Sequence, residues 1–198
     1  MTASPRVLVL GQQMPWLIAE LSARFRIHQL QSEEDPQAFL AAHGADFSGL
    51  VTSSATGLPA AVLAALPELQ VVSNFGVGVD HIDLRLMRQR GIAVGHTPDV
   101  LNDCVADLAI GLLIDVARGL SAADRFVRGG RWSQGSKFPL TTRVSGKRLG
   151  IVGLGRIGQA IAQRAAGFAL DIRYHSRRPV ASAPYGHEPD LLTLARWA

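Results

Sequence analysis

Short runs of β-branched residues and leucine alternate with helical stretches over the first half of the chain. The runs predict strands at residues 7–10, 26–30, 49–52, 69–73 and 92–94. The stretches between them predict helices at residues 15–25, 36–43, 59–66 and 83–90. Alternation of this kind is typical of a parallel sheet with helices on both faces. We therefore expect an α/β domain over residues 1–96.

The pattern changes at Thr97 and Pro98, where a hydroxyl residue followed by proline gives a helix-start signal. The helix predicted at residues 100–117 is apolar on nearly all faces, so we expect it to be buried, between domains or between subunits. Ser121 is expected to cap a second helix at residues 122–127.

The α/β pattern resumes only at Leu149, after a polar stretch at residues 131–145 that is predicted to be irregular. We therefore place a domain boundary near residues 96–97. The second α/β unit is expected to start in earnest at Leu149.

Composition excludes several classes of protein. The chain has 198 residues, 47% of them hydrophobic, which is enough for one large or two small domains. Cys104 is the only cysteine, so an intrachain disulfide is excluded and a thiolate-rich metal site is not expected. The longest apolar stretches, at residues 59–66 and 108–114, are too short to span a bilayer, and no leader-like segment opens the chain. We expect a cytoplasmic protein without a membrane partner.

Charge is distributed unevenly along the chain. Residues 1–117 carry six Arg and twelve acidic residues, a net charge of −6, whereas residues 118–178 carry thirteen basic and two acidic residues, a net charge of +11. A basic block of this kind suits a phosphate-bearing ligand or a nucleic acid. Because aromatic residues are scattered through the block rather than interleaved with its charges, we expect no nucleic-acid partner.

A glycine motif, GLGRIG at residues 153–158, lies between a predicted strand at 148–152 and a predicted helix at 159–168. The dinucleotide fingerprint has the same strand–loop–helix context. Its first glycine permits a tight turn, its second lets the backbone approach a pyrophosphate, and its third lets helix and strand pack closely. The expected cofactor-binding glycines are Gly153, Gly155 and Gly158.

The strand predicted at residues 171–175 leads into Ser176, Arg177 and Arg178. A site for NAD usually has an acidic residue at this point, which accepts hydrogen bonds from the ribose hydroxyls. Here no acid is present, whereas a hydroxyl and two guanidinium groups can bind a 2′-phosphate. We therefore expect NADP in preference to NAD; the alternative is that the two arginines form a solvated loop end.

A second glycine-containing loop, SNFGVGVD at residues 73–80, follows a predicted strand in the first domain. Glycine at alternate positions lets successive N–H groups converge on an anion. A small carboxylate fits such a nest, although the spacing alone is equally consistent with an ordinary glycine turn.

Four segments together carry a family resemblance: 51–53 (VTS), 74–83 (NFGVGVDHID), 91–109 (GIAVGHTPDVLNDCVADLA) and 145–162 (SGKRLGIVGLGRIGQAIA). On these residues the chain resembles the D-2-hydroxyacid dehydrogenases, in particular their glyoxylate and hydroxypyruvate reductase branch. The resemblance implies a flavodoxin-like substrate-binding domain at residues 1–96. It further implies an incomplete Rossmann domain at 97–198, with a dimerisation helix and arm at 98–145.

The resemblance also implies roles for single residues. Val77 and Gly78 would offer backbone N–H groups to a substrate carboxylate, with Ser53 on the neighbouring wall. The residues it implies at the cofactor are Asn102 beside the nicotinamide, Gly155, Arg156 and Ile157 at the pyrophosphate, and Ser176, Arg177 and Arg178 at the 2′-phosphate. The implied reaction is hydride transfer from NADPH to a small 2-keto acid, and the implied assembly is a homodimer.

The family's catalytic Arg, Glu and His would lie in sequence after Ala198. Within the chain, His81 and His96 are the only plausible substitutes for the proton donor. The chain alone is therefore expected to be inactive, and a non-catalytic role in binding a dinucleotide or a partner is the alternative.

Overall fold

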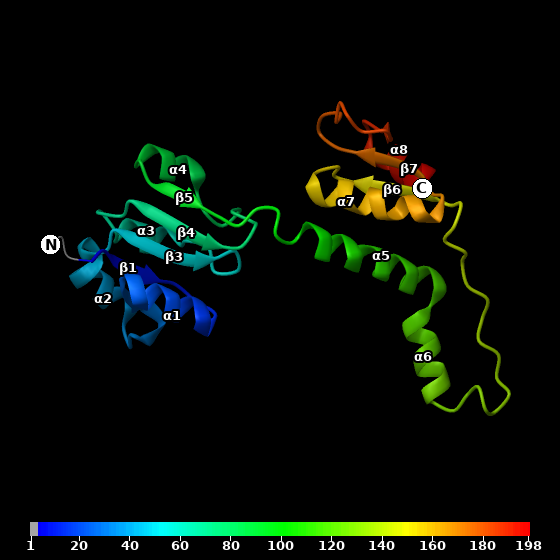
Figure 1. Ribbon diagram of the computed structural model, residues 1–198, viewed down its shortest axis with the longest axis horizontal. Helices are drawn as coiled ribbons and strands as arrows, with labels where there is room; N and C mark the ends of the chain where they lie inside the picture. The colour runs from blue at the N-terminus through cyan, green and yellow to red at the C-terminus, as the bar shows by residue number, and fades with distance from the viewer. Residues whose placement is uncertain (1–3) are drawn as a thin grey trace. The chain divides into compact units, whose positions relative to one another are not determined.

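The computed structural model describes residues 4–198. It divides the chain into two compact units, the first ending at Val100 and the second comprising Leu101–Ala198. Each unit has its own parallel sheet (Figure 1). Each unit also has its own hydrophobic core.

The first unit contains a five-stranded sheet in the order β2-β1-β3-β4-β5, and every neighbouring pair is parallel. Its elements are β1 (Arg6–Val9), α1 (Pro15–Arg24), β2 (Arg26–Gln29), α2 (Pro36–His43), β3 (Gly49–Ser53), α3 (Ala60–Ala64), β4 (Val71–Phe75), α4 (Leu84–Gln89) and β5 (Ala93–Gly95). The predicted alternation of five strands and four helices is confirmed, with most bounds shifted by one or two residues.

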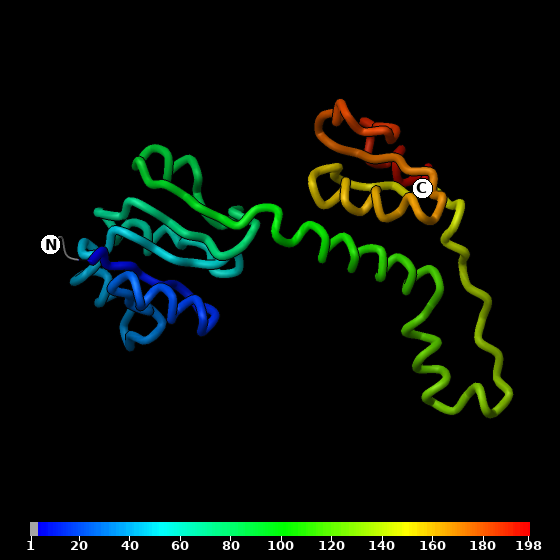
Figure 2. The backbone as a smooth tube through the Cα atoms, in the orientation of Figure 1, coloured from blue at the N-terminus to red at the C-terminus, as the bar shows by residue number. Residues whose placement is uncertain are grey.

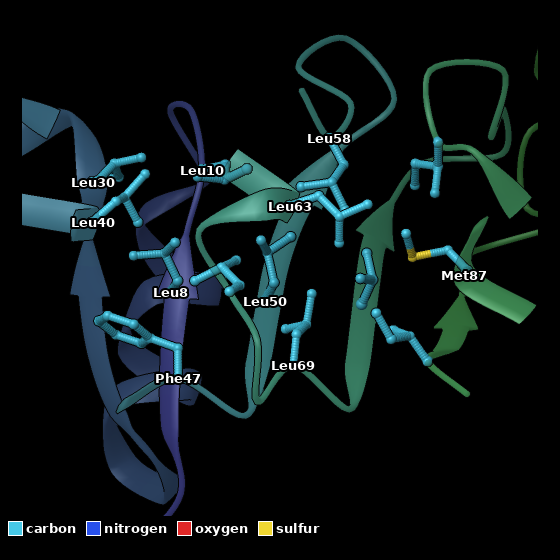
Figure 3. Close-up of a cluster of buried hydrophobic side chains, with 14 residues drawn as sticks. Leu8, Leu10, Leu30, Leu40, Phe47, Leu50, Leu58, Leu63, Leu69 and Met87 are labelled. Carbon is cyan, nitrogen blue, oxygen red and sulfur yellow. The ribbon is translucent and has the colours of Figure 1, made fainter. Parts of the chain in front are cut away.

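The core of the first unit lies on both faces of this sheet, because successive strand residues point to opposite faces. On one face, three buried valines of β1 and β3 pack against α1. The larger cluster on the other face draws leucines from the strands and further side chains from α2, α3 and α4 (Figure 3). It includes Leu8, Leu50, Leu40, Leu63 and Met87.

Aspartates begin two of these helices. The Asp35 carboxylate accepts hydrogen bonds of 3.0 Å from the N–H groups of Gln37 and Ala38, and Pro36 occupies the first helical turn of α2. The Asp83 carboxylate accepts from Leu86 N–H at 2.9 Å in α4. Each cap satisfies N–H groups that have no partner within the helix, which fixes where the helix begins.

The second unit contains a three-stranded parallel sheet in the order β6-β7-β8. Its elements are α5 (Asn102–Arg118), α6 (Leu120–Arg128), β6 (Arg148–Val152), α7 (Arg156–Ala165), β7 (Asp171–His175), β8 (Gly186–His187) and α8 (Leu191–Trp197). Figure 2 traces residues 129–147 between α6 and β6 as an irregular segment, as predicted for 131–145. The two-residue strand β8 has no counterpart in the sequence-based prediction.

The prediction that a helix starts at Thr97 and Pro98 is wrong. Helix α5 begins at Asn102, after a turn in which Asp99 has a φ of 70°. A left-handed residue cannot continue a right-handed helix, so the turn separates the proline from α5.

The predicted cap at Ser121 is also wrong. Gly119, with a φ of 62°, ends α5, and α6 begins at once with Leu120. Ser121 therefore lies inside the first turn of α6, where its N–H and its hydroxyl donate to the Asp115 carboxylate at 2.7 and 2.6 Å. These two hydrogen bonds lower the pKa of Asp115.

Helix α5 is less buried within this chain than its composition predicts. One side packs on α7, where Ala106 is buried and the Arg164 guanidinium contacts the carboxylates of Asp103 and Asp107. The opposite side carries an exposed apolar stripe at helical spacing, formed by Val105, Leu108, Leu112 and Val116. The expected burial of this helix, between domains or between subunits, therefore stays a prediction.

Candidate functional site

The glycine motif forms the turn between β6 and α7. Gly153 has a φ of 90° and donates its N–H to the carbonyl of His175 at 2.8 Å, which joins the turn to the end of β7. Gly155 is the N-cap of α7. A Cβ on Gly158 would stand 2.1 Å from the Gly153 carbonyl oxygen, so only glycine allows α7 to pack this closely on the turn.

An open depression of about 900 Å³ lies at this turn. It is lined by Val152, Gly153, Leu154, Gly155, His175, Ser176, Arg177, Arg178 and Val180. The depression therefore joins the glycine turn to the end of β7, and five of the nine predicted cofactor-binding residues line it.

The other predicted cofactor-binding residues do not line this depression. Arg156 and Ile157 are the first two residues of α7, and Gly158 is buried behind the turn. Asn102 is the half-buried first residue of α5. Sequence reasoning did not single out His175 or Val180, because one ends a strand and the other lies in a loop without a periodic pattern.

The charged end of the depression consists of Arg177 and Arg178, whose side chains are exposed. Over residues 4–198, neither arginine has an ion pair with a carboxylate. The Ser176 hydroxyl donates to the Arg178 carbonyl at 2.6 Å. No acidic residue lines the depression, so its electrostatic character is that of an anion site.

The second glycine loop, residues 76–80, is held through its carbonyl groups. The Asn74 amide donates to the Gly78 carbonyl at 2.9 Å and lies 3.3 Å from that of Gly76. The Ser54 hydroxyl donates to the same Gly78 oxygen at 2.7 Å. The His96 ring contacts the Val77 carbonyl through Nδ1 at 2.9 Å, and a carbonyl can only accept, so Nδ1 donates.

These contacts leave two backbone donors available. Within residues 4–198, the N–H groups of Val77 and Gly78 have no hydrogen-bond acceptor. Gly76 has a φ of 153°, and a Cβ there would stand 2.0 Å from the Ser54 hydroxyl. Ser53 lies at the end of β3 opposite Phe75, and its hydroxyl contacts that of Thr56 at 3.1 Å. The loop therefore has two free backbone donors, as the predicted nest requires.

Over residues 4–198 the structure contains no group of three or more His, Cys, Asp or Glu side chains that could hold a metal ion. In the same residues no helix is long and apolar enough to cross a membrane.

The sequence matches the family model for the D-isomer specific 2-hydroxyacid dehydrogenase, catalytic domain, over residues 7–188. The chain belongs to the D-isomer specific 2-hydroxyacid dehydrogenase family. The family resemblance inferred from the four sequence segments is thereby confirmed.

Several proteins are similar to this chain in both sequence and fold. Glyoxylate/hydroxypyruvate reductase A HPR2 of Arabidopsis thaliana is 42% identical over 190 residues, which cover 96% of this chain and 60% of that protein. The structure of 2-hydroxyacid dehydrogenase from Ketogulonicigenium vulgare Y25 matches with a TM-score of 0.91 and 38% identity, covering 99% of this chain and 62% of that one. The structure of the NADPH-dependent glyoxylate/hydroxypyruvate reductase of Sinorhizobium meliloti, in complex with NADP and malonate, matches with a TM-score of 0.86 and 39% identity. The match covers 98% of this chain and 60% of that one. The chain thus spans about 60% of the length of these relatives.

Proposed function

We propose that this chain serves an NADPH-dependent reductase that transfers hydride to a small 2-keto acid and yields the D-2-hydroxy acid. Hydroxypyruvate and glyoxylate are the substrates we expect, because relatives named for them are 42% and 39% identical to this chain. The observation that carries the proposal is the depression that runs from the glycine turn to Arg177 and Arg178 without an acidic residue in its lining.

The residues of the depression fit a dinucleotide phosphate. A Cβ on Gly155 would meet no atom within 4 Å, so the glycine leaves the space beside the turn open to a ligand. The N–H groups of the first turn of α7 are suited to a pyrophosphate. Arg177 and Arg178 supply two guanidinium groups for the 2′-phosphate, where a carboxylate would repel it. When bound, NADPH supplies the hydride.

The nest at residues 76–80 fits the carboxylate of the substrate. Val77 and Gly78 offer two N–H donors, and Asn74, Ser54 and His96 hold the intervening carbonyl groups away from the anion. Hydrogen bonds from N–H groups to a carboxylate are charge-assisted and directional, so two of them fix the orientation of a small keto acid.

We further propose that the chain forms a homodimer through α5. Val105, Leu108, Leu112 and Val116 are 40%, 62%, 54% and 85% exposed and lie on one side of the helix. A contiguous apolar stripe on a soluble protein marks an interface. Replacing Leu108 and Leu112 together by Asp should convert a dimer to a monomer in sedimentation velocity. A wild-type chain that sediments as a monomer would contradict this assignment.

Cofactor selectivity tests the main proposal. We expect the wild-type chain to bind NADP⁺ more tightly than NAD⁺ in isothermal titration calorimetry. Each arginine contributes a charge-assisted contact of about 1.5–3 kcal/mol to the phosphate. Replacing Arg177 and Arg178 together by Ala should therefore weaken NADP⁺ by about 100-fold or more. The affinity for NAD⁺, which lacks this phosphate, should change little.

A matched control is Arg196→Ala, which removes an exposed arginine from α8 in the same unit. This variant should bind both cofactors as the wild type does. Equal weakening of NADP⁺ and NAD⁺ in the double variant would refute the assignment of the 2′-phosphate site.

A further inference from the structure

The segment that follows β7, residues 176–180, has no regular secondary structure, yet its backbone is held at three points. We call this segment the phosphate loop. His187 Nε2 lies 3.0 Å from the Ser176 carbonyl oxygen. The Val180 N–H donates to the Tyr174 hydroxyl at 2.8 Å. Within the loop, the Ser176 hydroxyl donates to the Arg178 carbonyl.

Two of these contacts come from neighbouring residues of the sheet. Strand β8 pairs with β7 so that His187 stands opposite Tyr174, and their ring centroids are 5.1 Å apart. The Glu188 N–H donates to the Tyr174 carbonyl at 2.7 Å, and His175 Nδ1 lies 2.9 Å from the Glu188 carbonyl oxygen. The short strand β8 thus places the His187 ring beside the loop that β7 leads into.

The chemistry of each contact is determined by its partner. The Ser176 carbonyl can only accept, so His187 donates through Nε2. Tyr174 is 1% exposed, and its hydroxyl oxygen accepts the Val180 N–H. The contacts therefore fix both ends of the phosphate loop from the same face of the sheet.

The arginines between these two fixed ends are not themselves fixed. Arg177 and Arg178 are exposed and, within residues 4–198, form no ion pair. A long side chain loses rotamer freedom when it binds, and a mobile backbone would add to that loss. An anchored backbone confines both guanidinium groups to the charged end of the depression.

We infer that Tyr174 and His187 are positioning residues of the 2′-phosphate site and that the preference for NADP over NAD depends on their hydrogen bonds to the phosphate loop. The inference rests on the proposed function. Because the 2′-phosphate is present only in NADP, a loosened loop should weaken that cofactor selectively.

The chain offers a pair of variants that separate the hydrogen bond from the ring. His187→Phe keeps an aromatic ring beside Tyr174 but has no donor. His187→Gln removes the ring but keeps an N–H donor near the position of Nε2. Tyr174→Phe keeps the buried ring and removes only the acceptor for Val180.

Binding of NADP⁺ and NAD⁺ to the purified chain, measured by calorimetry, provides the readout. We expect His187→Phe and Tyr174→Phe each to weaken NADP⁺ by about five- to ten-fold, the effect of one net hydrogen bond. The affinity for NAD⁺ should stay within about two-fold, and His187→Gln should restore NADP⁺ binding to within about two-fold of wild type. Circular dichroism of each variant reports whether the fold is retained.

The outcomes separate the inference from the proposed function. If the wild-type chain shows no preference for NADP⁺, the proposed function and this inference both fail. If the wild type prefers NADP⁺ but His187→Phe and Tyr174→Phe keep that preference, only the inference fails. Equal weakening of both cofactors, or failure of His187→Gln to rescue, would show that the two residues act on general stability and would overturn the positioning role.

Discussion

Replacing Gly158 by alanine should push helix α7 away from the glycine turn. This one displacement should both destabilise the second unit and weaken cofactor binding. The added Cβ would stand 2.1 Å from the Gly153 carbonyl oxygen and 3.1 Å from its carbon, whereas ordinary contact starts at 3.4 Å. Both atoms belong to the backbone and cannot rotate away. Helix α7 and the glycine turn therefore have to separate by about 1.3 Å at their closest point.

Two opposing effects set the magnitude. Overpacking of this kind typically costs about 1–3 kcal/mol. Alanine in a helix interior contributes about 1 kcal/mol relative to glycine, which offsets part of that cost. We expect the free energy of unfolding to fall by up to about 2 kcal/mol. Since Gly153 lines the depression, its displacement should also weaken NADP⁺ by about ten-fold, the loss of one charge-assisted contact.

Urea denaturation followed by circular dichroism measures the first effect, and calorimetric titration with NADP⁺ measures the second. Gly111→Ala is the matched control, because it makes the same change inside α5 where the added Cβ meets nothing within 4 Å. That variant should gain about 0.5–1 kcal/mol. A Gly158→Ala chain that unfolds at the wild-type urea concentration and binds NADP⁺ normally would refute the reasoning.

Three further predictions concern stability. Leu8 is 0% exposed in the core of the first unit, so Leu8→Ala should lower its free energy of unfolding by about 2–5 kcal/mol in urea denaturation, and a loss below 1 kcal/mol would contradict the packing. Hydrogen bonds from the Thr193 hydroxyl and N–H lower the pKa of the Asp190 carboxyl below its ordinary value of 3.8. The ionised Asp190 therefore stabilises α8 fully above pH 3.8, and this stabilisation is lost as the pH falls through the lowered pKa. The urea midpoints of wild type and Asp190→Asn should therefore differ at neutral pH and converge in acid. Arg164→Ala should lower the melting temperature, because the Arg164 guanidinium on α7 pairs with two aspartates of α5. The difference in melting temperature between variant and wild type should shrink at high salt, since salt screens exposed ion pairs.

The sequence predicted most accurately those helices and strands whose ends are determined by residues close by in the chain. The bounds of α2, residues 36–43, agree with the prediction because Asp35 and Pro36 determine where the helix starts. The bounds of β7, residues 171–175, agree as well. The glycine motif was recognisable because its spacing and its flanking elements are contained in one short stretch of sequence.

The residues that support the two candidate sites could not be found in this way. Asn74, Ser54 and His96 come from different parts of the first unit and meet at the nest only because β3, β4 and β5 are neighbours in the sheet. Likewise β8 is two residues long, so it has no period to detect, and His187 reaches the phosphate loop only through its pairing with β7. Each failure therefore comes from contacts that the sheet topology creates.

Both sites use the same physical arrangement. In the nest, Asn74, Ser54 and His96 bind carbonyl groups and leave N–H donors free, and in the phosphate loop His187 binds a carbonyl and leaves guanidinium groups free. The groups suited to an anion are thus held indirectly, through the backbone that carries them. Because a preorganised backbone lowers the entropy lost on binding, the supporting residues should affect affinity for an anion without contacting it. Substitutions at these sites therefore fall into two kinds. One kind removes a group that contacts the ligand, and the other releases the loop that carries such a group.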